Sequence, residues 1–230
     1  MLTLSVLRKE LKNKAEKKKA KILQRFFKTG PGEYGEGDVF LGVVVPEIRK
    51  IVKEYGSLKL KDVAKLLRSK IHEERLTALL IMVNKFQAGE GRENIYRLYL
   101  KTTKYINNWD LVDLSADKIV GDYLLNKPKS ILYKLAKSKN VWERRIAIMS
   151  TFNFIKNNKF EETLKIAKTL LNDEHDLIHK AVGWMLREIG KRDLKTEEKF
   201  IKKYCKKMPR TMLRYAVERL PVKKRKQYLA

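Results

Sequence analysis

The chain has 230 residues, and 43% of them are hydrophobic, which suits a folded globular protein and excludes a disordered or fibrous one. Lysine and arginine number 53 against 27 acidic residues, so the net charge at neutral pH is +26. The longest apolar runs, residues 39–45 and 78–83, are far shorter than the roughly 20 residues of a membrane-spanning helix. We therefore expect a soluble, cytoplasmic protein that forms one domain over residues 1–230 and acts as a monomer.

The cysteines and histidines limit the chemistry that the chain can perform. Cys205 is the only cysteine, so no internal disulfide can form, and three scattered histidines provide no plausible set of zinc ligands. We therefore expect no metal-assisted chemistry. The three histidines, His72, His175 and His179, are expected at the surface or at helix caps.

The charge surplus indicates the kind of partner. A surface this basic repels itself, and a polyanion that neutralises it is the usual reason for carrying it. A general bias toward lysine would raise glutamate as well, and the acidic residues do not keep pace here. Nucleic acid is therefore the expected partner, although charge alone does not distinguish DNA from tRNA or ribosomal RNA.

Apolar residues near the N-terminus recur every three or four residues, which predicts one long amphipathic helix. Its apolar stripe comprises Leu4, Leu7, Leu11, Ala15, Ile22 and Phe26. The glycine-rich segment from Thr29 to Gly37 then ends the helix in a loop. Residues 39–45 resemble a strand, but a lone strand would have no partner. We instead expect a helix that has Pro46 in its first turn and stops at Gly56.

Beyond residue 56, apolar segments of helical period alternate with short polar breaks, which predicts an all-α protein. Several of these segments share an alanine, at separations of 38, 31, 34 and 35 residues. These alanines are Ala78, Ala116, Ala147, Ala181 and Ala216. A period in this range, with a small residue where neighbouring helices cross, is typical of a helical-repeat solenoid, or α-α superhelix.

Basic residues recur near the shared alanine. They are Arg75, Arg144 or Arg145, Lys180 and Arg214. Equivalent positions of successive repeats line one surface, so we expect these side chains to form a basic row that follows a phosphate backbone in a concave groove. Asp113 interrupts the row. An acid at a position that is basic in the other repeats conflicts with phosphate binding and marks a candidate functional residue.

Asp113 stands in a segment that reads as the start of a helix, where Asp110 is expected at the cap or in the first turn. A spacing of four residues places Trp109 and Asp113 on one helix face. Cleavage of a glycosidic bond develops positive charge on the sugar, and a carboxylate at about 4 Å stabilises that charge by ~4 kcal/mol at an effective dielectric constant of about 20. This corresponds to roughly a thousandfold in rate. An indole face adds about 0.5–2 kcal/mol.

Five stretches of the chain together resemble a known family. These are residues 26–30 continuing through 35–42, residues 108–113, residues 142–147, residues 180–188, and residues 208–211 continuing through 213–216. Each alone is a weak signal, but together and in order they resemble the DNA alkylation repair glycosylases built from HEAT-like repeats, the AlkD family. The resemblance covers essentially the whole chain and implies a HEAT-like helical-repeat fold.

The resemblance also implies a function: hydrolytic removal of cationic N3- or N7-alkylated purines from double-stranded DNA, without a metal or cofactor and without flipping the base into a pocket. It places Asp113 at the catalytic carboxylate, Trp109 and Trp184 at aromatic contacts to the deoxyribose, and Arg145 and Arg187 at the DNA backbone. Two positions depart from the family pattern. Asn108 stands where members often have a second tryptophan, and Phe27 stands where they often have tyrosine, so the lesion range is open.

Two other functions fit the same sequence features. One is a non-catalytic helical-repeat protein that binds distorted or branched DNA, because the fold alone does not imply catalysis. The other is a bifunctional lyase that attacks the sugar through a lysine. The presence of Trp109, Asp113 and Trp184 favours the hydrolytic glycosylase.

Overall fold

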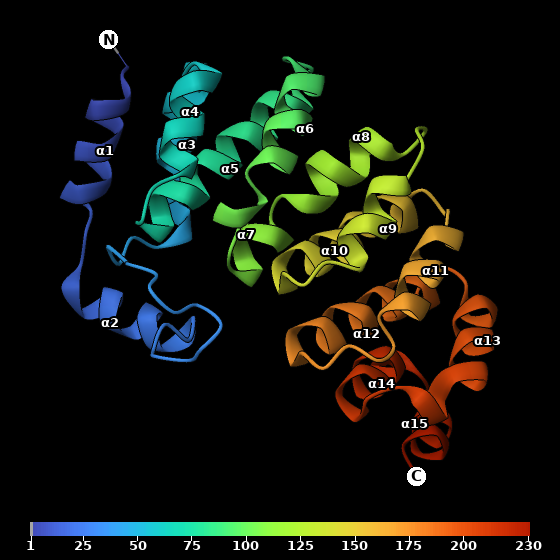
Figure 1. The fold of residues 1–230 in the computed structure, drawn as a ribbon. Coiled ribbons are helices and arrows are strands. Elements are labelled where there is room, and N and C mark those ends of the chain that lie inside the picture. The colour runs from blue at the N-terminus through green and yellow to red at the C-terminus, as the bar shows by residue number, and fades with distance from the viewer. Residues whose placement is uncertain (1) are drawn as a thin grey trace. The chain divides into compact units, whose positions relative to one another are not determined.

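The computed structural model describes residues 2–230, and contacts between residues divide the chain into two compact units, Met1–Ser115 and Ala116–Ala230. The first unit contains α1 (Leu4–Asn13), α2 (Lys17–Phe26), α3 (Val45–Glu54), α4 (Leu60–Leu67), α5 (His72–Gln87), α6 (Arg92–Lys101) and α7 (Trp109–Asp113) (Figure 1). The second contains a π-helical turn (Asp117–Gly121), α8 (Asp122–Leu124), α9 (Ser130–Ala136), α10 (Val141–Lys156), α11 (Glu161–Thr169), α12 (Asp176–Gly190), α13 (Leu194–Tyr204), α14 (Arg210–Ala216) and α15 (Val222–Leu229).

The all-α prediction is confirmed. Residues 2–230 contain no strand, and the nearest approach to one is an isolated bridge between Val39 and Ile71. The expectation of one domain over residues 1–230 stays a prediction, as does the concave basic groove.

The prediction of one long N-terminal helix is wrong, because the chain forms α1 and α2 with a break between them. Leu7 and Leu11 of α1 are fully buried, whereas α2 buries no residue and leaves Ile22 64% exposed. At the break, the backbone N–H of Glu16 donates to the Leu41 carbonyl at 3.0 Å. Gly42 approaches so closely that a Cβ there would lie 2.2 Å from the Glu16 carbonyl oxygen. A contact between distant segments therefore sets the break, and helical periodicity cannot reveal it.

The expected helix after residue 45 is confirmed, since α3 begins at Val45 with Pro46 in its first turn. The segment before it is held by a side chain and not by a sheet. The carboxylate of Glu73, which is 1% exposed, accepts hydrogen bonds from the backbone N–H groups of Leu41, Gly42 and Val43. Three donors that a strand partner would otherwise satisfy are thus paired with one buried acid.

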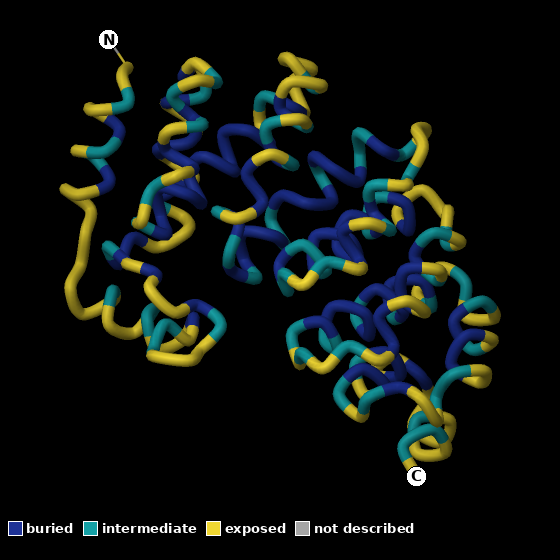
Figure 2. Tube along the Cα trace, viewed as in Figure 1, coloured by how far each residue is buried: buried dark blue, intermediate teal, exposed yellow. Residues whose placement is uncertain are grey.

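The helical repeat is also confirmed. The five alanines identified above are at most 1% exposed, and they lie on α5, just after α7, and on α10, α12 and α14. Within the second unit α10 packs on α12 and α12 on α14, and within the first unit α5 packs on α7. The crossing of α12 and α14 is close, because a Cβ at Gly183 would lie 2.4 Å from the Met212 carbonyl oxygen. Figure 2 shows the buried stretches of these helices in dark blue.

Candidate functional site

The short helix α7 carries Trp109 and Asp113, and both residues are half-buried. Asn108 caps the helix, since its Oδ1 accepts the backbone N–H of Trp109 at 2.8 Å. Asp110 lies in the first turn, as expected. Because α7 is helical from Trp109 to Asp113, the four-residue spacing brings the indole and the carboxylate to the same side of the helix, which confirms that part of the prediction.

An aromatic stack supports Trp109. Its ring stacks on Phe27 with centroids 5.1 Å apart and planes at 26°, and Phe27 stacks in turn on Phe40 at 5.2 Å. Phe27 is 8% exposed, so its ring faces other side chains and not solvent. Both faces of the Phe27 ring are covered by Trp109 and Phe40, and its assignment as a DNA-binding residue stays a prediction. The adjacent Phe26, which sequence reasoning did not single out, is 60% exposed and meets Trp109 edge-on at 5.7 Å.

A buried charged network lies next to the aromatic stack. His72 stacks on Phe40 at 4.4 Å; its Nδ1 lies 2.9 Å from Oδ2 of Asp38, and its Nε2 lies 2.9 Å from Oδ2 of Asp110. Arg75 also forms an ion pair with Asp38. His72 is 2% exposed, so the prediction of a surface or cap residue is wrong for this histidine. Its two acidic partners come from distant parts of the sequence, and no local pattern indicates them.

Electrostatics keep the His72 imidazole protonated. Burial alone would lower its pKa, but the charge of Asp110 and the hydrogen bonds to Asp110 and Asp38 outweigh burial and raise the pKa to about 9. For Asp38, burial works against ionisation, and the hydrogen bond from His72 with the charge of Arg75 holds the pKa below its usual value. The network therefore consists of charged partners, and it ties α5 to the first turn of α7.

The glycine-rich loop, residues 29–37, places Asp38 in this network. The N–H of Gly35 donates to the Lys28 carbonyl at 2.9 Å, and a Cβ at Gly35 would lie 2.5 Å from the Phe27 carbonyl oxygen. Glycine at this position thus lets the loop fold back on the end of α2. The loop connects the aromatic stack to the charged network.

In the second unit, α12 carries Trp184, which is half-buried and lies 6.1 Å from the ring of Phe152. Its indole N–H donates to Oε1 of Glu188 at 3.1 Å. Burial works against ionisation of Glu188, but hydrogen bonds from Lys191 and Trp184 hold its pKa below the usual value. A charged acceptor therefore fixes the orientation of the indole.

The helix caps show which positions are equivalent between repeats. The second helices of the successive repeats are α5, α7, α10, α12 and α14. The fifth residue after the N-cap of each is, in that order, Leu76, Asp113, Arg145, Lys180 and Arg214. Asp113 thus occupies a position that is basic in the three repeats that follow. Arg75 and Arg144 stand one residue earlier and do not belong to this set.

Arg75 and Arg144 share a different role. Each donates at 3.0 Å to the carbonyl of the serine six residues before it, Ser69 or Ser138. Each also pairs with an aspartate, since Arg75 meets Asp38, and Nε of Arg144 lies 2.6 Å from Oδ2 of Asp173. Arg75 is 3% exposed, and the side chain of Arg144 is 18% exposed. The expected basic row is therefore wrong for these two arginines, which hold the turns in front of α5 and α10.

The remaining predicted contacts differ in how far they are exposed. Arg145 is 5% exposed and donates to the Leu177 carbonyl at the start of α12, which contradicts its expected place in an exposed row. Nζ of Lys180 lies 2.7 Å from Oδ2 of Asp176, and Arg187 forms an ion pair with Glu218. Arg214 is exposed. Whether any of these residues touches DNA stays a prediction.

Within residues 2–230, no helix is long and apolar enough to cross a membrane, and no three His, Cys, Asp or Glu residues are grouped to hold a metal ion.

Comparisons with known proteins place the chain in a family. A structure described as a predicted DNA alkylation repair enzyme from Enterococcus faecalis is similar with a TM-score of 0.72 at 18% identity, over 91% of this chain and 98% of that one. At that identity the likeness shows the shared fold. No curated protein is similar enough to be matched. The family model of the DNA alkylation repair enzymes matches residues 7–220. Because this match covers nearly the whole sequence, the chain belongs to the family of DNA alkylation repair enzymes, and DNA is its partner.

Proposed function

We propose that the protein is a monofunctional DNA glycosylase that hydrolyses the N-glycosidic bond of cationic N3- or N7-alkylated purines in duplex DNA. The observation that carries this proposal is the placement of Asp113. It is a carboxylate beside an indole on α7, at a repeat position that is basic in the three following repeats. A carboxylate at this position, in a chain with a net charge of +26, suits a reaction that develops positive charge on a DNA sugar.

In the proposed reaction, the bond between C1′ and the purine nitrogen breaks, and its electron pair goes to the base. An alkylated purine that carries a positive charge then leaves as a neutral base, so no general acid is required. Water adds to C1′ and loses a proton, giving an abasic site. Asp113 stabilises the electron-poor sugar and orients or deprotonates the water. No metal or cofactor takes part in these steps.

Other side chains are assigned to contacts with the sugar, the base and the backbone phosphates. The indole of Trp109 stacks on Phe27 with one face and contacts the charged sugar or base with the rest of its surface. This contact contributes about 0.5–2 kcal/mol by cation–π attraction. We assign Trp184 to a second deoxyribose contact, with its N–H held by Glu188. Contacts to backbone phosphates are assigned to Arg145, Lys180, Arg187 and Arg214. The exposed Arg214 carries this assignment most directly.

The test is release of 7-methylguanine from methylated duplex DNA by the wild-type protein and by Asp113→Asn. The substitution removes one charge while keeping the shape, so release should fall at least ~100-fold. Binding to undamaged duplex should stay nearly unchanged. Unchanged release would eliminate the mechanism. Absence of release by the wild-type protein, with binding to damaged DNA intact, would instead support the non-catalytic binder. Borohydride trapping on abasic DNA would reveal a lyase.

A further inference from the structure

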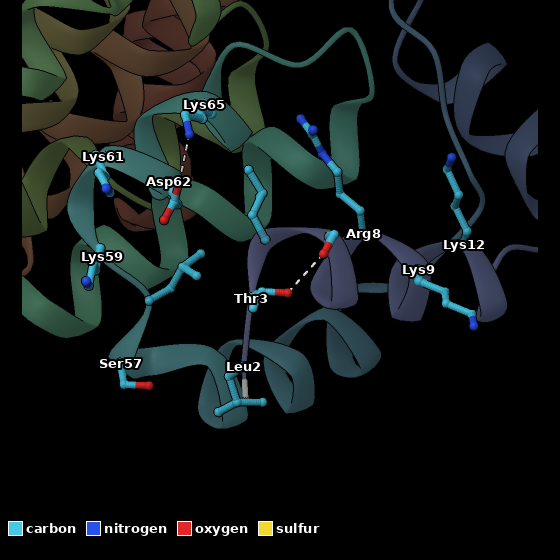
Figure 3. A pocket seen from close by; sticks show the side chains of 13 residues that line it. Leu2, Thr3, Arg8, Lys9, Lys12, Ser57, Lys59, Lys61, Asp62 and Lys65 are labelled. Carbon is cyan, nitrogen blue, oxygen red and sulfur yellow. Dashed lines mark hydrogen bonds and ion pairs between the residues drawn. The ribbon is translucent and has the colours of Figure 1, made fainter.

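A second basic feature lies in the first unit, away from α7. An open pocket of about 840 Å³ is formed by α1 with the two residues that precede it and by α4 with the turn that precedes it (Figure 3). None of its lining residues belongs to α7, the aromatic stack or the buried charged network. Six of its 13 lining residues are lysine or arginine, compared with 53 of 230 in the whole chain. The pocket is thus about twice as rich in cations as the protein.

Most of this charge is not neutralised within the protein. Arg8 pairs with the buried Glu74 at 3.0 Å, and Lys65 pairs with Asp62, the one acidic lining residue, at 3.0 Å. The other four cations, Lys9, Lys12, Lys59 and Lys61, are exposed and form no ion pair within residues 2–230. In Figure 3, Lys59 and Lys61 lie on one side of the pocket and Lys9 and Lys12 on the other.

Backbone dipoles reinforce the positive potential. The first turn of α1, which Thr3 caps, contains no acidic residue. Helix α4 has no side-chain cap at Lys59, and the acid of its first turn, Asp62, is paired with Lys65. The positive ends of both helices border the pocket, where four lysines already stand. An anion that enters therefore meets like-signed contributions from side chains and from backbone.

The lining groups also limit what kind of anion fits. No aromatic side chain lines the pocket, so it offers no surface on which a base would stack, and its four unpaired cations are lysines, which lack the fixed fork of arginine. Such a lining recognises phosphate charge and not base identity. DNA is the partner of this family, and its backbone supplies phosphates regardless of sequence.

We propose that this pocket, which we call the α1–α4 pocket, is a further binding site for the sugar-phosphate backbone of duplex DNA, in addition to the contacts assigned above. It is sequence-independent and does not take part in base release. It adds phosphate contacts that raise affinity for any duplex. The proposal depends on DNA as the partner and not on glycosidic hydrolysis.

The first measurement locates the contact. Lysines are acetylated with and without an undamaged duplex of about 25 bp at low salt, and the modified peptides are identified by mass spectrometry. We expect Lys9, Lys12, Lys59 and Lys61 to be protected by DNA, and the protection to disappear at high salt. A parallel sample contains tripolyphosphate in place of DNA. Protection by tripolyphosphate but not by DNA would overturn the proposal in favour of a small phosphate compound.

The second measurement gives the contribution of the α1–α4 pocket to the affinity for duplex DNA. In one variant these four lysines are replaced by glutamine: Lys9→Gln, Lys12→Gln, Lys59→Gln and Lys61→Gln. A matched variant removes the same amount of charge from four exposed lysines elsewhere, of which one directly follows α9, one is in α11 and two are in α13. Its substitutions are Lys137→Gln, Lys168→Gln, Lys199→Gln and Lys202→Gln. Circular dichroism checks that both are folded.

We expect the pocket variant to bind the undamaged duplex at least ~10-fold more weakly than wild type, and the slope of log K against log salt to decrease by about 2, which corresponds to two phosphate contacts. The matched variant should lose ~2-fold or less. Equal losses in the two variants would show only a general effect of net charge and would overturn the proposal. Because the DNA is undamaged, failure of the glycosylase proposal would leave this result standing.

Discussion

The Nε2 atom of His72 lies 2.9 Å from Oδ2 of Asp110, and this contact joins α5 to the first turn of the helix that carries Trp109 and Asp113. The imidazole is 2% exposed and shares its other nitrogen with Asp38. A protonated histidine between two carboxylates thus ties α7 to α5. His72 is therefore a positioning residue, and its protonation state is linked to stability.

The pKa of His72 predicts how stability depends on pH. The folded-state pKa, about 9, is above the ordinary value of 6.5, so the folded protein binds the proton more tightly than the unfolded chain does. The stabilisation is complete below pH 6.5 and is lost as pH rises toward 9, by about 3 kcal/mol in total. Urea unfolding of the wild type and of His72→Gln, across pH 6 to 10, measures it as the difference between the two curves.

The difference between wild type and His72→Gln should be largest at pH 6 and should shrink at high pH. A pH-independent difference would contradict a charged His72. The double variant His72→Gln/Asp110→Asn is the control, because it removes the charge that His72→Gln leaves buried without its partner. It should be more stable than His72→Gln alone.

A pair of arginines tests the assigned phosphate contacts. Arg145 and Arg214 occupy equivalent repeat positions, but Arg145 is buried and bonded to the Leu177 carbonyl, whereas Arg214 is exposed. Arg145→Ala should cost about 1–3 kcal/mol of stability, because it leaves that carbonyl without its donor. If both arginines touch DNA, each alanine variant should reduce the salt slope of binding by about 0.9.

Arg214→Ala should change the slope without a measurable loss of stability, and so serves as the matched comparison. Equilibrium binding at several salt concentrations gives the slopes, and thermal unfolding gives the stabilities. A loss of stability in Arg145→Ala with an unchanged slope would remove Arg145 from the DNA-binding residues and leave it a structural role between α10 and α12.

Glu197 in α13 is buried without a matching cation close enough to offset its desolvation. Its carboxyl lies against Gly190, where a Cβ would be 1.7 Å from Oε2, and burial with the nearby Glu198 raises its pKa to about 8. The folded state therefore keeps a proton that the unfolded chain releases above about pH 4.5. Stability falls as pH rises from 4.5 to 8, because the folded protein gives up this proton less readily.

Glu197→Gln imitates the protonated acid and should stabilise the protein at pH 7.5 by about 4 kcal/mol. At pH 4 the variant and the wild type should be equally stable. Denaturant unfolding at the two pH values decides the question, and a variant that is no more stable at pH 7.5 would contradict a raised pKa.

Local patterns in the sequence were sufficient for several features. The period of the apolar residues predicted helices throughout, and the spacing of the five alanines predicted the repeat, because a helix must bury one stripe and a close crossing requires a small residue. The four-residue spacing of Trp109 and Asp113 placed them together on α7, since helix geometry fixes that relation locally. The family resemblance was also sound, as the match over residues 7–220 shows.

Other features depend on contacts between distant segments. The break after α1 follows from Gly42 passing Glu16, and the burial of His72 and Arg75 follows from Asp38, which lies more than thirty residues away in the sequence. A basic residue at a repeat position is compatible with both a phosphate contact and an internal ion pair. Sequence by itself determined the helical repeat and the placement of Trp109 and Asp113 on one helix. Only tertiary structure decided which charges are buried in pairs, because desolvation and pairing depend on neighbours that the linear order does not specify.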